Sequence, residues 1–408
     1  MQTQAAGGLN ERRVPPAWLV GASQLPFGVT CGFVITALPF LLTKAGVSVD
    51  RVATVSATVM SPTFWGFLVT PLVDVGFSRR TYVLLTAAIS ACCVFGALWR
   101  LTPSHLGWFT ALLLVGELSI VVFSNASAGW MSEFVPDETR GRVGGWINAA
   151  NLGAGALGAM ISLELAEKFA LPIVGLVLAA SIFLPVLTVL WFPAPHRPKL
   201  RMREILSGTL RNVWQVSKTR ECLLGFALFL SPASCAAAIN LFSGLGKDFR
   251  TDPQWVIWVT GAGCAISSSI GALVGGYLAD RIRRSSAYLF AGISGALIAL
   301  AMAFVPHGPA SFTAGVLAYN ATAGISYAAF TALGLQLVGK DHPAASTQFA
   351  LFGAAANGAI VYMTWVDGQG YRLFGARGLL FVDALASLCA ATILLLVLRR
   401  AGRLVRAV

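Results

Sequence analysis

Long runs of apolar residues follow one another along this chain, with only short polar breaks between them. About 18 consecutive apolar residues cross a bilayer core roughly 30 Å thick. Twelve runs reach about this length, at 18–43, 52–73, 82–101, 106–132, 143–165, 171–193, 222–246, 255–279, 287–306, 309–338, 347–368 and 376–398. Spanning strands would instead alternate apolar and polar residues over about ten positions. Because these runs are continuously apolar, they predict an all-α polytopic membrane protein with twelve transmembrane helices.

The composition supports the same prediction. Of the 408 residues, 56% are hydrophobic and only 11% are charged, whereas soluble domains carry about 25% charged residues. The chain therefore has too little polar surface for a water-soluble globule. Its first residues are polar and its first apolar run is too long for the core of a signal peptide, so we expect no cleaved leader.

The basic residues are unevenly distributed. The net charge is +12, and twelve spans put both termini on one side, which then collects 21 of the 29 Lys and Arg residues. These are Arg12, Arg13, Arg79, Arg80, Arg140, Arg142, the seven basic residues between 197 and 220, Arg281, Arg283, Arg284, Lys340, Arg399, Arg400, Arg403 and Arg406. The positive-inside rule places that side, and both termini, in the cytoplasm. The basic excess indicates topology and attraction to anionic lipid, not a nucleic-acid partner.

One sizeable polar segment, "PAPHRPKLRMREILSGTLRNVWQVSKTRE", follows the sixth run. Its Pro-rich start and its basic, weakly amphipathic remainder indicate a linker with a helix that lies on the membrane surface. The chain is thereby divided into an N-terminal six-helix half at 1–193, a cytoplasmic linker at 194–221, a C-terminal six-helix half at 222–398 and a basic cytoplasmic tail at 399–408.

The two halves repeat at an offset of 206 positions. Residues that coincide at this offset include the pairs Pro26 and Pro232, Ser61 and Ser267, Asp74 and Asp280, Tyr82 and Tyr288, and Asn151 and Asn357. Recurrence of Pro, Asp and Asn at one offset is hard to attribute to chance. Two six-helix halves that face each other across a central site are typical of secondary transporters. The two prolines would leave backbone groups unpaired and are expected bending points.

Asp74 and Asp280 each end an apolar run and are followed by basic residues. An Asp in this place can face a helix N-terminus, which carries about half a positive charge, and can accept hydrogen bonds from a nearby Arg. Such a contact would form while the cytoplasmic side is closed and break when the halves rock apart. The alternative is solvated charge that only sets topology. The predicted cytoplasmic gate consists of Asp74, Arg79, Arg80, Asp280, Arg281, Arg284, Glu133 and Arg140.

Several stretches carry a resemblance to a known family. "GGYLADRIRR" resembles the helix 2–3 motif G-x-L-a-D-R-x-x-R-R of the major facilitator superfamily, here on helices 8–9. "SPTFWGFLVTPLVD", "EFVPDETRGRVGGWINAANLGAGALG" and "ASTQFALFGAAANG" are similar to helices 2, 4–5 and 11 of the AmpG-like muropeptide permeases and their acetyl-coenzyme A transporter relatives. Helix 4 reads "SNASAGWMSE", without the Asp and Arg usual in AmpG-like permeases. The length better matches the compact siderophore permeases of the RhtX and FptX kind.

Two carboxyl groups lie within the apolar runs. Glu117 is near the middle of the fourth run, where a charge is costly unless it is paired or neutralised. A carboxyl there can stay protonated, which suits a proton-coupling site, although a permanently neutral Glu bonded to another helix is the alternative. Asp383 lies in helix 12, a lipid-side helix in the resembled fold, and Arg377 could pair with it. We expect a structural role for Asp383.

Polar residues in the helices that would face a central cavity are the candidates for substrate binding. Asn and aromatic side chains suit a polar solute with apolar parts, but they also join helices to one another. The candidates are Gln24, Asn125, Asn148, Asn151, Asn240, Tyr319, Asn320, Tyr327 and Asn357.

Enzymatic and ATP-driven functions lack their motifs. Gly246-Lys247 and Gly339-Lys340 are each followed by Asp, so neither forms a phosphate-binding loop. The seven cysteines lie in or beside apolar runs without a C-x-x-C pair, and we interpret them as packing residues. All four His residues fall in loops. We expect no enzymatic activity, no cofactor and no metal, and the short loops leave no room for a signalling domain.

These observations favour a multi-pass secondary transporter in a bacterial cytoplasmic (inner) membrane, acting as a monomer by alternating access. We expect it to import a bulky organic small molecule together with protons. A siderophore or ferric siderophore ranks slightly above a muropeptide or a coenzyme A ester. The alternative is a proton-driven exporter of drugs or metabolites. Drug antiporters usually carry a Gly-Pro motif on helix 5, which "NLGAGALGAMIS" lacks.

Overall fold

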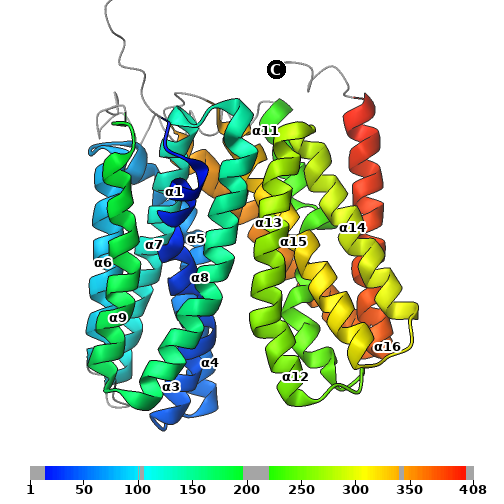
Figure 1. Ribbon diagram of the computed structural model, residues 1–408, viewed down its shortest axis with the longest axis horizontal. Coiled ribbons are helices and arrows are strands. Elements are labelled where there is room, and N and C mark those ends of the chain that lie inside the picture. The colour runs from blue at the N-terminus through cyan, green and yellow to red at the C-terminus, as the bar shows by residue number, and fades with distance from the viewer. Residues whose placement is uncertain (1–13, 100, 102–104, 196–219, 340–343, 401–408) are drawn as a thin grey trace, which may run out of the picture.

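The computed structural model describes residues 14–99, 101, 105–195, 220–339 and 344–400. Every element in these ranges is helical, as the continuously apolar runs predict. The helices form two upright bundles side by side, one from each half of the chain (Figure 1). The start of α1 and the end of α16 lie at the same end of the molecule, which we call the terminal end.

The first bundle packs around its own apolar core, which includes Phe33, Leu42, Phe109 and Phe123. Its elements are α1 (Ala17–Ala22), α2 (Leu25–Gly32), η1 (Phe33–Ala37), α3 (Leu38–Lys44), α4 (Val49–Met60), α5 (Pro62–Trp65), η2 (Gly66–Leu68), η3 (Thr70–Asp74), α6 (Arg79–Trp99), α7 (Leu106–Phe134), η5 (Asp137–Thr139), α8 (Arg140–Lys168), α9 (Leu171–Phe183) and η6 (Leu184–Trp191).

The second bundle has separate apolar clusters, with Phe242, Phe312 and Leu380 in one and Phe229 and Phe352 in another. Its elements are α11 (Arg220–Leu230), η7 (Pro232–Ser234), η8 (Ala237–Gly246), α12 (Pro253–Trp258), η9 (Val259–Gly263), α13 (Cys264–Arg281), α14 (Arg284–Phe304), α15 (Pro309–Val338) and α16 (Ala345–Arg400). Most of the predicted linker, at 196–219, and the tail at 401–408 lie outside the described residues.

Nine helical stretches in the described ranges are long and apolar enough to cross a membrane. One of them, Ala345–Val397, contains the non-helical residues Phe374 and Gly375. A Cβ on Gly370 would lie 2.8 Å from the backbone oxygen of Gly378, so the chain turns back on itself there. Its two arms correspond to the predicted helices 347–368 and 376–398.

The predicted helices 52–73 and 222–246 are not among the nine, because both are broken into short pieces. In the first of them, Pro62 is the first residue of α5 and Pro71 is the second residue of η3. Pro232 begins η7 in the second, and Ala236 then takes a left-handed backbone conformation with φ of 55°. Proline lacks the N–H that would continue a helix, so breaks at these positions have a local cause. The count of twelve spanning helices stays a prediction.

The two bundles meet through glycines near the terminal end. A Cβ on Gly276 of α13 would lie 2.5 Å from the backbone oxygen of Gly141 on α8, and one on Gly145 would lie 2.8 Å from the oxygen of Ala272. Small residues at such positions let two helix backbones approach closely. The Gly-rich part of α8 therefore brings the first bundle against the second.

Candidate functional site

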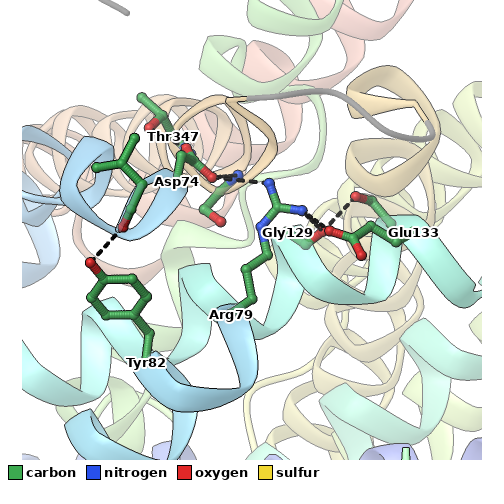
Figure 2. Close-up of polar contacts among 9 residues, drawn as sticks. Asp74, Arg79, Tyr82, Gly129, Glu133 and Thr347 are labelled. Atoms are coloured by element: carbon green, nitrogen blue, oxygen red, sulfur yellow. Dashed lines mark hydrogen bonds and ion pairs between the residues drawn. The ribbon is translucent and has the colours of Figure 1, made fainter. Parts of the chain in front are cut away.

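Asp74 lies at the end of η3 and is buried. Its carboxylate accepts hydrogen bonds from the backbone N–H groups of Ser346 (3.2 Å) and Thr347 (3.0 Å) and from Thr347 Oγ1 (2.7 Å). These donors belong to the first turn of α16, where a helix has N–H groups without internal partners and a partial positive charge. A carboxylate of the first bundle thus caps a helix of the second (Figure 2).

Arg79, the first residue of α6, joins this contact to α7. Its guanidinium donates to Asp74 Oδ1 at 3.1 Å, to the backbone oxygen of Gly129 at 3.1 Å and to the Glu133 carboxylate. Figure 2 shows the guanidinium between the two carboxylates, with Asp74 on one side and Glu133 on the other. The structure therefore brings together three of the predicted gate residues.

Asp280 makes the corresponding contact in the opposite direction. It lies near the end of α13 and accepts hydrogen bonds from the backbone N–H groups of Gly141 (2.6 Å) and Arg142 (3.0 Å). Both donors are in the first turn of α8, which begins at Arg140. A carboxylate of the second bundle thus caps a helix of the first. The two bundles are joined by a reciprocal pair of carboxylate contacts.

The basic partner of Asp280 is Arg142, which is not among the predicted gate residues. Arg142 Nε donates to Asp280 Oδ2 at 3.0 Å, whereas Arg281 lies over the ring of Tyr277, 3.9 Å from its centre. Arg281 follows Asp280 directly along a helix, so its side chain points to a different face. Arg142 lies on α8 of the first bundle and contacts Asp280 across the junction.

The remaining gate candidates lie near the two contacts. Arg284 donates to Gln336 Oε1 at 2.8 Å and to the backbone oxygen of Asp137. Arg140 forms an ion pair with Asp137 at 2.6 Å. The loop between α7 and α8 is thereby tied to the second bundle through Arg284.

Arg80, the last of the predicted gate residues, faces the first bundle only. It donates to the backbone oxygen of Phe192, and its guanidinium lies 5.5 Å from the centre of the Trp130 ring. Both contacts are within the first bundle, so Arg80 supports that bundle rather than the junction.

A cavity of about 290 Å³ lies between the two bundles. Six of the nine predicted substrate-binding residues line it, namely Gln24, Asn125, Asn148, Asn151, Tyr327 and Asn357. Aromatic side chains complete the lining, among them Phe27, Phe67, Phe330 and Phe349. Within the described part of the chain, no charged side chain contributes to the lining. The cavity therefore suits a solute that has polar and apolar parts and that is uncharged or carries charges that cancel one another.

The cavity asparagines differ in how much hydrogen-bonding capacity they have left. Asn148 Nδ2 donates to Thr331 Oγ1 at 2.8 Å, and Asn357 Nδ2 donates to the backbone oxygen of Thr63 at 3.3 Å. Both bonds cross between the bundles. Asn151 Oδ1 is buried and has no hydrogen-bond partner among the described residues. Asn151 is therefore the asparagine best placed to bind a solute.

Three other candidates lie outside the cavity lining. Asn240 donates to Thr364 Oγ1 at 3.1 Å, and Asn320 donates to the backbone oxygen of Val316 at 2.9 Å. Tyr319 donates to Asp383 Oδ2 at 2.9 Å. All three bonds stay within the second bundle. The structure gives these residues roles in helix packing and does not bring them to the cavity.

Glu117 is 2% exposed and lies near the middle of α7. It does not line the cavity. The neighbouring residue Gly116 packs against Cys93, because a Cβ on Gly116 would lie 3.2 Å from Cβ of Cys93. Glu117 Oε2 has no hydrogen-bond partner among the described residues. Glu117 is thus a buried carboxyl inside the first bundle, separate from the junction of the two bundles.

Asp383 is bonded to Tyr319, and it forms no ion pair with Arg377 among those in the described residues. A second acid, Asp367, is not among the predicted site residues, although its side chain is fully buried in α16. The repeat gave no signal for it, because the residue that coincides with Asp367 in the first half is Ile161.

Metal ligands and reactive cysteines do not form a second kind of site in the described residues. They contain no group of three or more His, Cys, Asp or Glu residues that could hold a metal ion. None of the seven cysteines is in a disulfide bond. The chemistry available at the junction is therefore that of carboxylates, guanidinium groups, amides and aromatic rings.

A family model described as the Major Facilitator Superfamily matches residues 20–361. No curated protein matches the chain. Among solved structures, the human organic anion transporter MFSD10 (TETRAN) superposes with a TM-score of 0.69 at 17% identity, covering 93% of this chain and 100% of its own. The fucose:proton symporter FucP of E. coli gives 0.68 at 14% identity, covering 93% and 98%.

A bacterial homologue of the iron transporter ferroportin, in an outward-facing state, gives a TM-score of 0.65 at 16% identity, with 93% of this chain and 98% of that chain covered. At these identities the superpositions show a shared fold. The family model covers most of the chain, from the first spanning helix into α16. The chain therefore belongs to the Major Facilitator Superfamily, whose members are membrane transporters and not enzymes.

Proposed function

We propose that this protein is a proton-coupled secondary transporter of a bacterial inner membrane that imports a bulky organic solute by alternating access. Twelve spanning helices would place both termini, and thus the terminal end of the molecule, in the cytoplasm. The basic residues near that end support this orientation through the positive-inside rule. A monomer suffices, because the cavity lies between two bundles of one chain.

The reciprocal carboxylate contacts are the observation that carries the proposal. Asp74 caps α16 and Asp280 caps α8, and each bond joins one bundle to the other. Rocking the bundles apart at the terminal end would separate each carboxylate from its helix N-terminus and leave both partially unpaired. The contacts therefore favour one of two arrangements, as alternating access requires. We infer that the structure represents the state that is closed to the cytoplasm.

The lining of the cavity narrows the solute class. A coenzyme A ester is a polyanion, and among the described residues no cationic side chain lines the cavity. Binding there would remove water from its negative charges without replacing it by a positive partner, which is unfavourable. A siderophore or its ferric complex presents amide and hydroxyl groups on an apolar frame, which asparagine and phenylalanine side chains can match. We therefore favour a siderophore over a coenzyme A ester, with a muropeptide between them because it carries carboxylates.

The size of the cavity constrains the mechanism. Sites for drug-sized ligands enclose about 300–1,000 Å³, and the cavity of about 290 Å³ is at the lower limit of that range. A bulky solute would therefore need the bundles to separate further at the end opposite the Asp74 and Asp280 contacts. Solute binding would then be coupled to the rocking motion.

Uptake by purified protein in proteoliposomes would test the function. Imposing an inward proton gradient should accelerate accumulation of a radiolabelled ferric siderophore above that of a labelled muropeptide or coenzyme A ester. Dissipating the gradient with a protonophore should reduce uptake of the labelled solute to the rate at which it equilibrates across the membrane without a gradient. If instead the imposed gradient drives solute against the direction of proton entry, the protein is an exporter and the importer assignment is wrong.

Asn151→Ala should weaken solute binding at the cavity. A lost hydrogen bond to a neutral group costs about 0.5–1.5 kcal/mol, which is roughly a 2- to 12-fold increase in the KM of uptake. The maximal rate should change little, because no hydrogen bond among the described residues joins the Asn151 side chain to the second bundle. Asn240→Ala is the matched control, since its side chain bonds Thr364 outside the cavity. Equal KM values for wild type and Asn151→Ala would contradict this placement.

Glu117→Gln should alter proton coupling while preserving the shape of α7. Glutamine keeps the size and hydrogen-bonding ability of a neutral carboxyl but cannot exchange a proton. We expect gradient-driven accumulation to fall by about tenfold or more, a typical contribution of a positioned proton-transfer group being 10²–10⁴-fold, while solute equilibration without a gradient persists. If Glu117→Gln accumulates solute at the wild-type rate with the same pH dependence, Glu117 is not the proton site.

A further inference from the structure

Two buried acids in the second bundle are not used by the function proposed above. Asp367 and Asp383 lie on the two arms of α16, with exposed fractions of 0% and 1%. The arms cross closely where Gly370 meets Gly378. Asp367 lies three residues before Gly370 and Asp383 five residues after Gly378, so each acid is within about one and a half helical turns of the crossing.

The carboxyl groups have little compensation for a charge. Both oxygens of Asp367 and Oδ1 of Asp383 are buried without a hydrogen-bond partner among the described residues. Within the part of the chain that the structure describes, the one donor to the pair is the Tyr319 hydroxyl, 2.9 Å from Asp383 Oδ2. No ion pair in the described residues includes either acid. Two negative charges in these surroundings would be strongly unfavourable.

The groups facing the pair come from several elements. Cys235 lies between η7 and η8, Tyr319 is on α15, and both acids act electrostatically on these two residues. The charge of Asp383 also acts on Asp367. Tyr288 and Tyr362 lie within electrostatic reach of the same Cys235. These neighbours are acids that stay neutral near neutral pH, and none of them supplies a positive charge.

Tyr371 lies one turn beyond Asp367, and its hydroxyl donates to Asp248 at 3.0 Å on the exposed surface. The Asp248 carboxylate therefore has a hydrogen-bond partner and access to water. The buried Asp367 carboxyl has no hydrogen-bond partner among the described residues. Cys235, a neighbour of the acid pair, also lines the central cavity. The acid pair is thereby close to the cavity without being part of its lining.

We propose that Asp367 and Asp383 form a second proton-binding site, in which the two carboxyl groups hold at least one proton at neutral pH. Two carboxyl groups that share a site cannot both ionise without repulsion, so one proton is retained between them. A transition-metal ion is the less suitable ligand, since the described residues contain no group of three or more His, Cys, Asp or Glu side chains that could hold one. Use of this proton in transport rests on the proposed function, whereas occupancy by the proton does not.

Infrared difference spectroscopy of the protein in lipid bilayers would test occupancy without any transport measurement. Isotope labelling of aspartate at the side-chain carboxyl carbon separates aspartate from Glu117. The wild type should show a protonated aspartate carboxyl band at neutral pH that disappears only in alkaline buffer. Absence of that band from the wild-type protein at neutral pH would overturn the proposal, and this measurement depends on no variant.

Substitutions then assign the band. Asp367→Asn and Asp383→Asn should each remove or shift it, while Asp248→Asn, the matched surface control, should leave it unchanged. Tyr319→Phe keeps both carboxyls but removes their one donor, and should move the disappearance of the band to higher pH. If Asp367→Asn folds and the band is unchanged, the assignment to this pair is wrong. If the wild-type band is lost when NaCl replaces choline chloride at constant pH, the site binds sodium and the proposal is wrong.

Discussion

Asp74→Asn is expected to loosen the closed arrangement at the terminal end of the molecule. Asparagine keeps the shape of the side chain but loses the charge that faces the first turn of α16 and Arg79. A hydrogen bond to a charged group contributes about 1.5–3 kcal/mol, which corresponds to roughly a 10- to 150-fold change in the ratio of closed to open states. Backbone hydrogen exchange at Ser346 and Thr347 should accelerate, and gradient-driven uptake should fall.

Asp280→Asn should produce the same change at the other contact, with faster exchange at Gly141 and Arg142. Asp50→Asn is the control, because this exposed acid at the start of α4 lies at the far end of the broken segment that ends in Asp74. If Asp74→Asn leaves exchange at Ser346 and Thr347 as slow as in the wild type, the carboxylate does not hold the two bundles together.

Gly276→Ala is expected to prevent the close approach of α13 to α8. The added methyl group would lie 2.5 Å from the backbone oxygen of Gly141 and 2.8 Å from Cα of Gly145. Both are backbone atoms that cannot turn aside. Overpacking of this kind costs about 1–3 kcal/mol, so the closed state should lose roughly a factor of 5 to 150 against the open state. Hydrogen exchange in the first turns of α8 should accelerate.

Two other glycines separate this effect from general destabilisation. A methyl group at Gly153, also on α8, would meet only Ser269 Oγ at 3.7 Å, an ordinary contact. Gly153→Ala should therefore behave as the wild type. A methyl group at Gly275 would lie 2.5 Å from Cα of Ile325, within the second bundle. Gly275→Ala should lower the unfolding temperature without favouring the open state. If Gly276→Ala behaves like Gly275→Ala, the bundle contact does not regulate opening.

The contacts at the terminal end explain why the repeat keeps an Asp in each half. Each carboxylate caps a helix in the opposite bundle, so loss of one leaves the other in place. The remaining contact would still favour the closed arrangement. We therefore expect Asp74→Asn combined with Asp280→Asn to open the terminal end further than either substitution alone, which the same exchange measurement would show.

Much of the fold could be predicted from local patterns. The continuously apolar runs predicted helices, because a spanning segment must satisfy its backbone hydrogen bonds internally. The ends of several helices agree within a few residues, as for the predicted 309–338 and the observed Pro309–Val338. The broken helices that end in Asp74 and begin at Arg220 could not be predicted as breaks from hydropathy alone. Their prolines were the only local signal.

The sequence by itself determined which residues were candidates for the junction, since the repeat at a fixed offset singled out Asp74 and Asp280 by type and position. It could not determine their partners. Arg142 and Thr347 are distant in sequence from the acids that they bind, and only the packing of α8 against α13 and of α16 against η3 brings them together. The same holds for Asp367, whose isolation depends on how the two arms of α16 cross. Hydropathy and repeats are local properties, whereas the compensation of a buried charge depends on every element packed around it.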